Sequence, residues 1–148
     1  MFCMRAVRRL HPRLICALAG MASAACSAGF NSASQAGLGC VDDTHECIEQ
    51  RRVALNAIMS DKGRTWVREA PTAEAYASGV RLFAFKTRKT ELSCDELAVG
   101  RREAENAPVV LRGPQASNLT PAQVSRGLML GAEVSRELAA EMKRRCRV

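Results

Sequence analysis

Residues 120–146, TPAQVSRGLMLGAEVSRELAAEMKRRC, contain the clearest structural signal in the chain. Thr120 suits an N-cap, Pro121 suits the first helical position, and Gln123 completes a capping box. Apolar residues then recur at helical spacing on one side, and charged residues fall on the other. These are Val124, Leu128, Val134, Leu138 and Met142 on the apolar side and Arg126, Glu133, Arg136, Glu137 and Lys143 on the charged side. The stretch predicts one long amphipathic helix, at about 121–145, that buries one face.

Two further segments carry helix signals. Asp43, together with the apolar spacing that follows it, predicts a helix that runs to about Ser60. The capping-box pattern at residues 93–96 opens another helix. We expect this helix to end before Pro108, because a proline ring disfavours the α conformation of the preceding residue.

The segment at residues 72–89 is compatible with two structures. Tyr76, Val80 and Phe83 have helical spacing. Residues 79–86 also suit a short strand, because a glycine opens this stretch and several of the residues after it favour sheets. We favour the helix, since a single strand would have no partner elsewhere in the chain.

The fold class that these elements predict is all-α, a small up-and-down bundle of about four helices with two disulfides, after a cleaved signal peptide. Residues 41–148 form its single domain, with irregular connections at 61–71 and 108–119. In such a bundle the first and third helices begin, and the fourth ends, at the same end of the molecule. The cysteines near these helix ends would therefore lie together.

Four cysteines follow residue 28, namely Cys40, Cys47, Cys94 and Cys146. In an exported chain they predict two disulfides, for which three connectivities exist. We favour Cys94–Cys146 and Cys40–Cys47, and crossed pairings remain open. The gaps of 6, 46 and 51 residues do not resemble the spacing of zinc ligands. The lack of a Cys-x-x-Cys motif argues against a redox-active pair.

The first 28 residues have the composition of a secretory signal peptide, which we expect to be cleaved between residues 24 and 28. Residues 1–13 contain four arginines and no acidic residue, and residues 14–25 are uncharged and apolar. This apolar run is shorter than the roughly 20 residues of a transmembrane helix. The chain is therefore expected to be exported, and its mature part to have no transmembrane helix.

Processing before Cys26 is an alternative, because a bacterial lipoprotein carries its lipid on an N-terminal cysteine. Three positions earlier the chain has Ser23, where a lipoprotein signal usually has leucine. Residues 29–40, rich in Ser, Ala, Gly, Asn and Gln, are expected to form a flexible tether. The protein is predicted to be periplasmic or secreted. With a lipid on Cys26 it would instead be anchored to a bacterial membrane.

The formal net charge of +7 overstates the positive charge of the mature chain. Four of the 22 basic residues and none of the 15 acidic residues lie in the signal, which leaves 18 minus 15, or +3. Nucleic-acid binding is therefore not expected. Two basic clusters would form a cationic patch for an anionic lipid surface or an envelope protein. They comprise Lys86, Arg88, Lys89, Lys143, Arg144, Arg145 and Arg147.

The sequence has no recognised signature of a catalytic, cofactor-binding or metal site. His45 is the only histidine after the signal and lies beside Asp42, Asp43 and Glu46. Acidic residues at a helix start are explained by the helix dipole, so we assign no catalytic role to them. Serines occur, but none in Gly-x-Ser-x-Gly. We expect Trp66 to pack in the core rather than against a partner.

A small exported cell-envelope protein with a structural or binding role, and without catalytic activity, is the function that these observations favour. One alternative is a periplasmic inhibitor or accessory subunit of an exported enzyme, a task that suits a rigid disulfide-linked domain. Another is a thiol redox protein, which requires an exposed and reducible cysteine pair.

Overall fold

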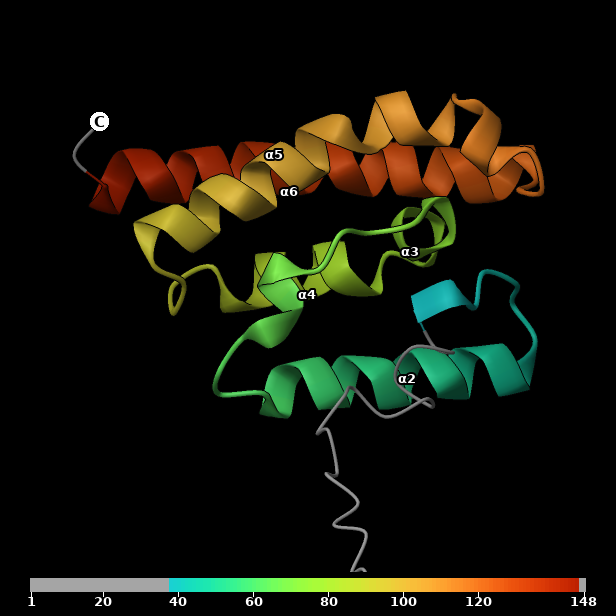
Figure 1. Ribbon diagram of the computed structural model, residues 1–148, viewed down its shortest axis with the longest axis horizontal. Coiled ribbons are helices and arrows are strands. Elements are labelled where there is room, and N and C mark those ends of the chain that lie inside the picture. Colours follow the sequence, from blue (N-terminus) through green and yellow to red (C-terminus); the bar gives the residue numbers. More distant parts are fainter. Residues whose placement is uncertain (1–37, 147–148) are drawn as a thin grey trace, which may run out of the picture.

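The computed structural model describes residues 38–146. Within this range the chain is all-helical, with five α-helices, two short 3-10 helices and no strand (Figure 1). The all-α class predicted from the sequence is therefore confirmed for this part of the chain. The predicted signal peptide, Cys26, residues 29–37 of the predicted tether and Arg147 lie outside the described residues.

Helix α6 (Pro121–Arg145) has the bounds that its capping box and apolar spacing predict. The Thr120 side chain accepts a hydrogen bond from the backbone N–H of Gln123, and the Gln123 side chain accepts one from the backbone N–H of Thr120. Val134 and Leu138, on the predicted apolar side, are fully buried. The capping interactions and the buried apolar face therefore specify the same helix.

Helix α2 (His45–Ser60) begins slightly later than predicted. Its N-cap is Thr44 rather than Asp43, because the Thr44 hydroxyl accepts a hydrogen bond from the backbone N–H of Cys47 at 3.2 Å. Ala54 and Ile58 are the buried apolar residues of its later turns. Asp43 lies just outside the helix and pairs with two arginines instead.

The ambiguous segment forms two helices, α3 (Ala73–Ser78) and α4 (Val80–Arg88). The favoured helical interpretation is thus confirmed, but one helix has become two. Gly79 separates them with a φ of 75°, a left-handed conformation that glycine adopts without strain. A side chain here would also collide with Leu130, whose Cδ2 lies 2.7 Å from the ideal Cβ position.

Helix α5 (Cys94–Leu111) continues through Pro108, so the prediction that it ends before this proline is wrong. A proline inside a helix removes one hydrogen bond, here to the carbonyl of Ala104, and disfavours the preceding residue without forbidding it. Ala107 and Leu111 are buried in the last turns of α5, which packs lengthwise against α6 (Figure 1). This tertiary packing outweighs the local cost of the proline.

The topology is not the simple up-and-down bundle that we expected. The connection at residues 61–72, which includes the 3-10 helix η1 (Thr65–Arg68), returns the chain to the other end of the molecule before α3 begins (Figure 1). Helices α2, α4 and α6 consequently run in one direction and α5 in the opposite one. The disulfide region at the start of α2 lies beside the start of α6, where Gln123 Nε2 donates to the Val41 carbonyl at 3.1 Å.

The expected meeting of all four cysteines at one end is therefore wrong. Cys40 and Cys47 lie at the start of α2, whereas Cys94 and Cys146 lie at the opposite end of the molecule, where α5 begins and α6 ends (Figure 1). The prediction failed because it assumed that consecutive helices are antiparallel, whereas the returning connection after α2 makes α2 and α4 parallel.

The core contains three of the four aromatic residues in the described part of the chain. Trp66, Tyr76 and Phe85 are almost completely buried, as expected for Trp66. The rings of Trp66 and Phe85 meet edge to face with centroids 4.6 Å apart. Arg81 lies over the Trp66 ring, 5.9 Å from its centroid, and so brings a buried charge into the same region.

Candidate interaction surface

The structure contains two disulfides, Cys40–Cys47 and Cys94–Cys146, with Cα atoms 5.5 Å and 5.8 Å apart. This is the connectivity that we favoured among the three. The first closes a short loop before α2, and the second joins the start of α5 to the end of α6. Each disulfide therefore fixes one end of the described chain to the folded domain.

The two predicted basic clusters do lie near each other, but they share their surface with acidic residues from α6. Lys86 Nζ lies 2.5 Å from a carboxylate oxygen of Glu133 and 3.2 Å from one of Glu137. Lys89 also pairs with Glu137. The hydrogen bond from Lys89, with a further one from Lys86, holds the pKa of the Glu137 carboxyl below its usual value.

Three of the four remaining described cations of the predicted patch have similar partners. Arg88 pairs with Glu91 at 2.8 Å. Arg144 and Arg145 both pair with Glu141, at 2.6 Å and 2.8 Å, and Glu141 is itself buried. The hydrogen bond from Arg144 lowers the pKa of that carboxyl. Lys143 is exposed. The patch is therefore a network of ion pairs, in which much of the positive charge is compensated.

The acidic residues around His45 have structural partners as well. Asp42 accepts hydrogen bonds from the hydroxyl and the backbone N–H of Thr44, and the hydroxyl bond in particular lowers the pKa of the Asp42 carboxyl. Asp43 pairs with Arg51 and, across to α6, with Arg126 at 3.1 Å. His45 is exposed. The arrangement secures the loop before α2, as the helix-start interpretation suggested.

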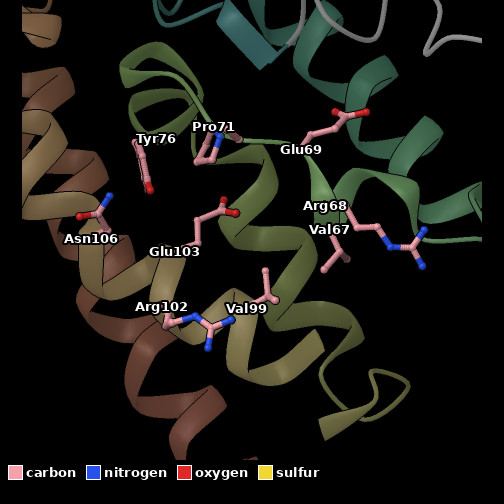
Figure 2. Close-up of a pocket in the computed structure, with 10 residues that line it drawn as sticks. Val67, Arg68, Glu69, Pro71, Tyr76, Val99, Arg102, Glu103 and Asn106 are labelled. Carbon is pink, nitrogen blue, oxygen red and sulfur yellow. The ribbon is translucent and has the colours of Figure 1, made fainter. Parts of the chain in front are cut away.

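An open pocket of about 580 Å³ lies between the connection after η1 and helix α5 (Figure 2). Glu103 contributes a buried carboxylate to its wall, and Arg81 holds that carboxylate with two hydrogen bonds of 3.0 Å and 2.7 Å. Tyr76 lies on the same wall, where burial and the negative charge of Glu103 raise the pKa of its phenol. The buried carboxylate of this pocket is thus already engaged by a structural partner.

A second, apolar depression of about 360 Å³ lies between α2 and α4, with one residue of α6 in its lining, and we call it the α2–α4 groove. Its lining residues are Ile48, Arg51, Arg52, Leu55, Ser78, Gly79, Val80, Phe83 and Leu130. Phe83 is 46% exposed and Ile48 is 50% exposed. Large apolar side chains that line a depression while remaining this exposed are typical of an interaction site.

This surface was not predicted from the sequence, because the helical spacing grouped Phe83 with Tyr76 and Val80 on one continuous helix. The break at Gly79 resets the helical phase, and the buried face of α4 then includes Leu82 and Phe85. Phe83 is two positions from Phe85, a rotation of about 200°, so the two rings cannot both face the core. This two-residue spacing is the sequence signal that could have identified one of the two phenylalanines as exposed.

Comparison of the chain with protein-family models, with curated proteins and with solved structures finds no match. Among the described helices, none combines the length and the apolar character that crossing a membrane requires. The fold and the surface together define a class of protein, a small all-helical domain with two disulfides and an apolar groove between two helices.

Proposed function

We propose that this protein is a small exported cell-envelope protein with a non-catalytic binding role, and that the α2–α4 groove binds an amphipathic helix of a partner protein. The observation that carries the proposal is the exposure of Phe83. The other described aromatic residues, Trp66, Tyr76 and Phe85, are at most 2% exposed. This domain has few aromatic side chains, and one of them is exposed in an apolar depression. An exposed aromatic side chain in such a place is typical of a binding hot spot.

The shape of the groove suits a helix as its occupant. Helices α2 and α4 run in the same direction and both line the depression, and Leu130 of α6 contributes to the same lining. A helix placed along such a channel presents apolar side chains every three or four residues to the same surface. Phe83, Ile48 and Leu55 would supply the contacts to those side chains.

The charge at the rim favours an acidic flank on the partner helix. Arg52 lines the groove, and its side chain is 61% exposed while it pairs with Glu49 on the same helix. An exposed pair of this kind contributes little stability, so a partner carboxylate can replace Glu49 at small cost. Arg51 is held more firmly, because its guanidinium donates to the Asp42 carbonyl at 2.7 Å.

The ion-pair network supports a protein partner over an anionic lipid surface. Lys86, Lys89 and Arg145 are paired with Glu137 and Glu141, so lipid phosphates would have to displace carboxylates that already lie at hydrogen-bond distance. A role as inhibitor or accessory subunit of an exported enzyme is the special case in which that enzyme is the partner. Two disulfides suit it, because a preorganised surface loses less entropy on binding.

Photo-crosslinking tests the proposal. A photoreactive phenylalanine analogue replaces Phe83 in one version of the protein and Val109 in a control version, and adducts are identified after irradiation of cells that produce the protein. Val109 is a fair control because it is 71% exposed on α5, away from the groove lining. We expect one protein adduct at position 83 that is absent at position 109 and is lost when Ile48→Asp is added.

Other outcomes reject this binding mode. Lipid adducts at position 83 would assign the groove to a membrane surface instead. The same set of protein adducts at both positions, or an adduct at position 83 that survives Ile48→Asp, would show that the groove does not select a partner.

A further inference from the structure

We infer that the Cys40–Cys47 disulfide is a site of thiol–disulfide exchange, in which the dithiol of a partner protein attacks Cys40 and Cys47 is the leaving group. The inference does not rest on the proposed binding of a helix, although Arg51 belongs both to the α2–α4 groove and to the surroundings of this disulfide. It is a form of the thiol redox alternative. The chain has no Cys-x-x-Cys motif, so the argument rests on the surroundings of the two sulfur atoms.

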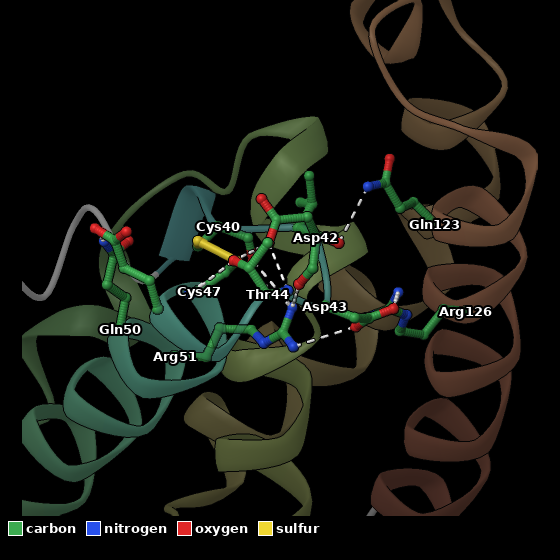
Figure 3. Close-up of a disulfide and its surroundings, with 11 residues drawn as sticks. Cys40, Asp42, Asp43, Thr44, Cys47, Gln50, Arg51, Gln123 and Arg126 are labelled. Carbon is green, nitrogen blue, oxygen red and sulfur yellow. Dashed lines mark hydrogen bonds and ion pairs between the residues drawn. A yellow bond between two sulfur atoms is a disulfide. The ribbon is translucent and has the colours of Figure 1, made fainter.

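The two sulfurs of this disulfide differ in access. Cys47 is only 1% exposed, because it lies in the first turn of α2 and faces the core. Cys40 is partly exposed, in the non-helical segment before α2 (Figure 3). An external thiolate can therefore reach Cys40 and not Cys47. Exchange is directed by which sulfur is accessible and by how well the other carries a negative charge.

The surroundings of Cys47 stabilise a departing thiolate. Arg51, one turn further along α2, directs Nη1 at Cys47 Sγ from 3.9 Å (Figure 3). The positive end of the helix dipole acts in the same direction, since Cys47 lies in the first turn. Asp42 opposes them, because its carboxylate lies within 4.8 Å of both sulfurs. The hydrogen bond from the Thr44 hydroxyl keeps that carboxylate ionised, so the opposing charge remains.

The second disulfide is not directed in the same way. Cys94 is exposed and Cys146 is partly exposed, so an external thiolate can reach either sulfur. Attack at Cys94 releases Cys146 at the C-terminal end of α6, and attack at Cys146 releases Cys94 in the first turn of α5. The two disulfides therefore differ in the position of the adduct that a single thiol leaves, which is Cys40 alone for the first and either cysteine for the second.

The exchange balances in two steps. The attacking thiolate forms a bond with Cys40 Sγ, the Cys40–Cys47 bond breaks, and its electron pair stays on Cys47 as a thiolate. The second thiol of the partner then loses its proton and attacks the mixed disulfide, which releases Cys40 as a thiolate. The partner dithiol is oxidised to a disulfide by two electrons, and Cys40 and Cys47 are reduced by the same two.

Differential alkylation of the folded, oxidised full chain tests the inference. Dithiothreitol serves as the dithiol probe, the reaction is quenched with acid at a series of times, and new thiols are mapped on peptides. We expect thiols to appear at Cys40 and Cys47 while the domain is still folded. A Cys40–Cys47 disulfide that opens only when the domain is unfolded in urea would overturn the inference.

Two further measurements test the chemistry directly. In Arg51→Gln the release of Cys40 and Cys47 should be about three- to tenfold slower, because the leaving thiolate loses its cation. In the control Arg101→Gln, which alters an exposed arginine of α5 that pairs with Glu105, the rate should not change. Glutathione, a single thiol, should leave its adduct on Cys40. Equal rates in the two variants, or an adduct on Cys47, would refute the mechanism.

Discussion

Arg81 of α4 and Glu103 of α5 form an ion pair inside the protein, with Nη2 and Oε2 2.7 Å apart and side chains only 2% and 6% exposed. The same guanidinium donates to the carbonyl oxygens of Trp66, at 2.6 Å, and Glu69, at 2.8 Å. One side chain therefore joins α5 to the connection that returns the chain after α2.

Arg81→Met should destabilise the fold by about 3–5 kcal/mol, because it leaves the Glu103 carboxylate buried without a counter-charge. Equilibrium unfolding in urea measures this loss. The double variant Arg81→Met, Glu103→Leu should recover part of it, since no unpaired charge remains. Arg101→Met, which breaks the exposed pair with Glu105, should cost less than about 1 kcal/mol. Similar losses in both single variants would contradict the buried pair's role.

Removal of the Cys94–Cys146 disulfide should cost more stability than removal of Cys40–Cys47. The two bonds close loops with sequence separations of 52 and 7, and loop-closure entropy then gives about 4 and about 2.5 kcal/mol. The paired alanine variants, unfolded in urea side by side, test the ranking. The reverse order would mean that native contacts at the start of α2, rather than unfolded-chain entropy, set the contribution of Cys40–Cys47.

Gly100→Ala should destabilise the protein by about 1–3 kcal/mol, although alanine favours helices more than glycine does. A Cβ at this position would lie 2.6 Å from Cε1 of Phe85, which is itself fully buried and cannot move aside freely. Thermal unfolding of the variant measures the loss. Adding Phe85→Leu should make the Gly100→Ala substitution less costly than it is beside the intact ring. Equal costs in both backgrounds would exclude the steric cause.

The ion pairs of Glu137 should make stability depend on pH in the acidic range. Lys89 first, and Lys86 as well, hold the folded-state pKa of this carboxyl below its ordinary value of 4.5. The stability that the pairs contribute is therefore fully present above that value and is lost as the pH falls through the lower folded-state pKa. Urea midpoints between about pH 6 and pH 3 should fall less steeply in Glu137→Gln. An unchanged slope would contradict the assignment.

Sequence reasoning succeeded where local and tertiary preferences agree. The capping box at Thr120 and the apolar face with Val134 and Leu138 specify the same helix, so its bounds followed from the sequence. It failed at Pro108, where a local rule was outweighed by burial of Leu111 against α6. That burial depends on a distant segment and was not visible in the nearby residues.

The surface features were harder to predict for a related reason. The basic residues at 86–89 and 143–145 were correctly expected to lie near each other, but the charges opposite them come from one face of α6 and depend on how that helix is rotated. The relative positions of the cysteines depended on the direction of α2, which the path of residues 61–72 determines. The spacing of residues along the chain contains little information on the rotation of α6 or on the direction of α2.

The placement of the disulfides also has a mechanical consequence. A force that pulls the described chain from its two ends passes from Cys40 directly to Cys47 and from Cys146 directly to Cys94. Helices α5 and α6 lie almost entirely within the second closed loop, so they carry no tension while that bond is intact. Stretching would unravel α2, α3 and α4 first, and the α5–α6 hairpin would remain folded as a covalently protected remnant.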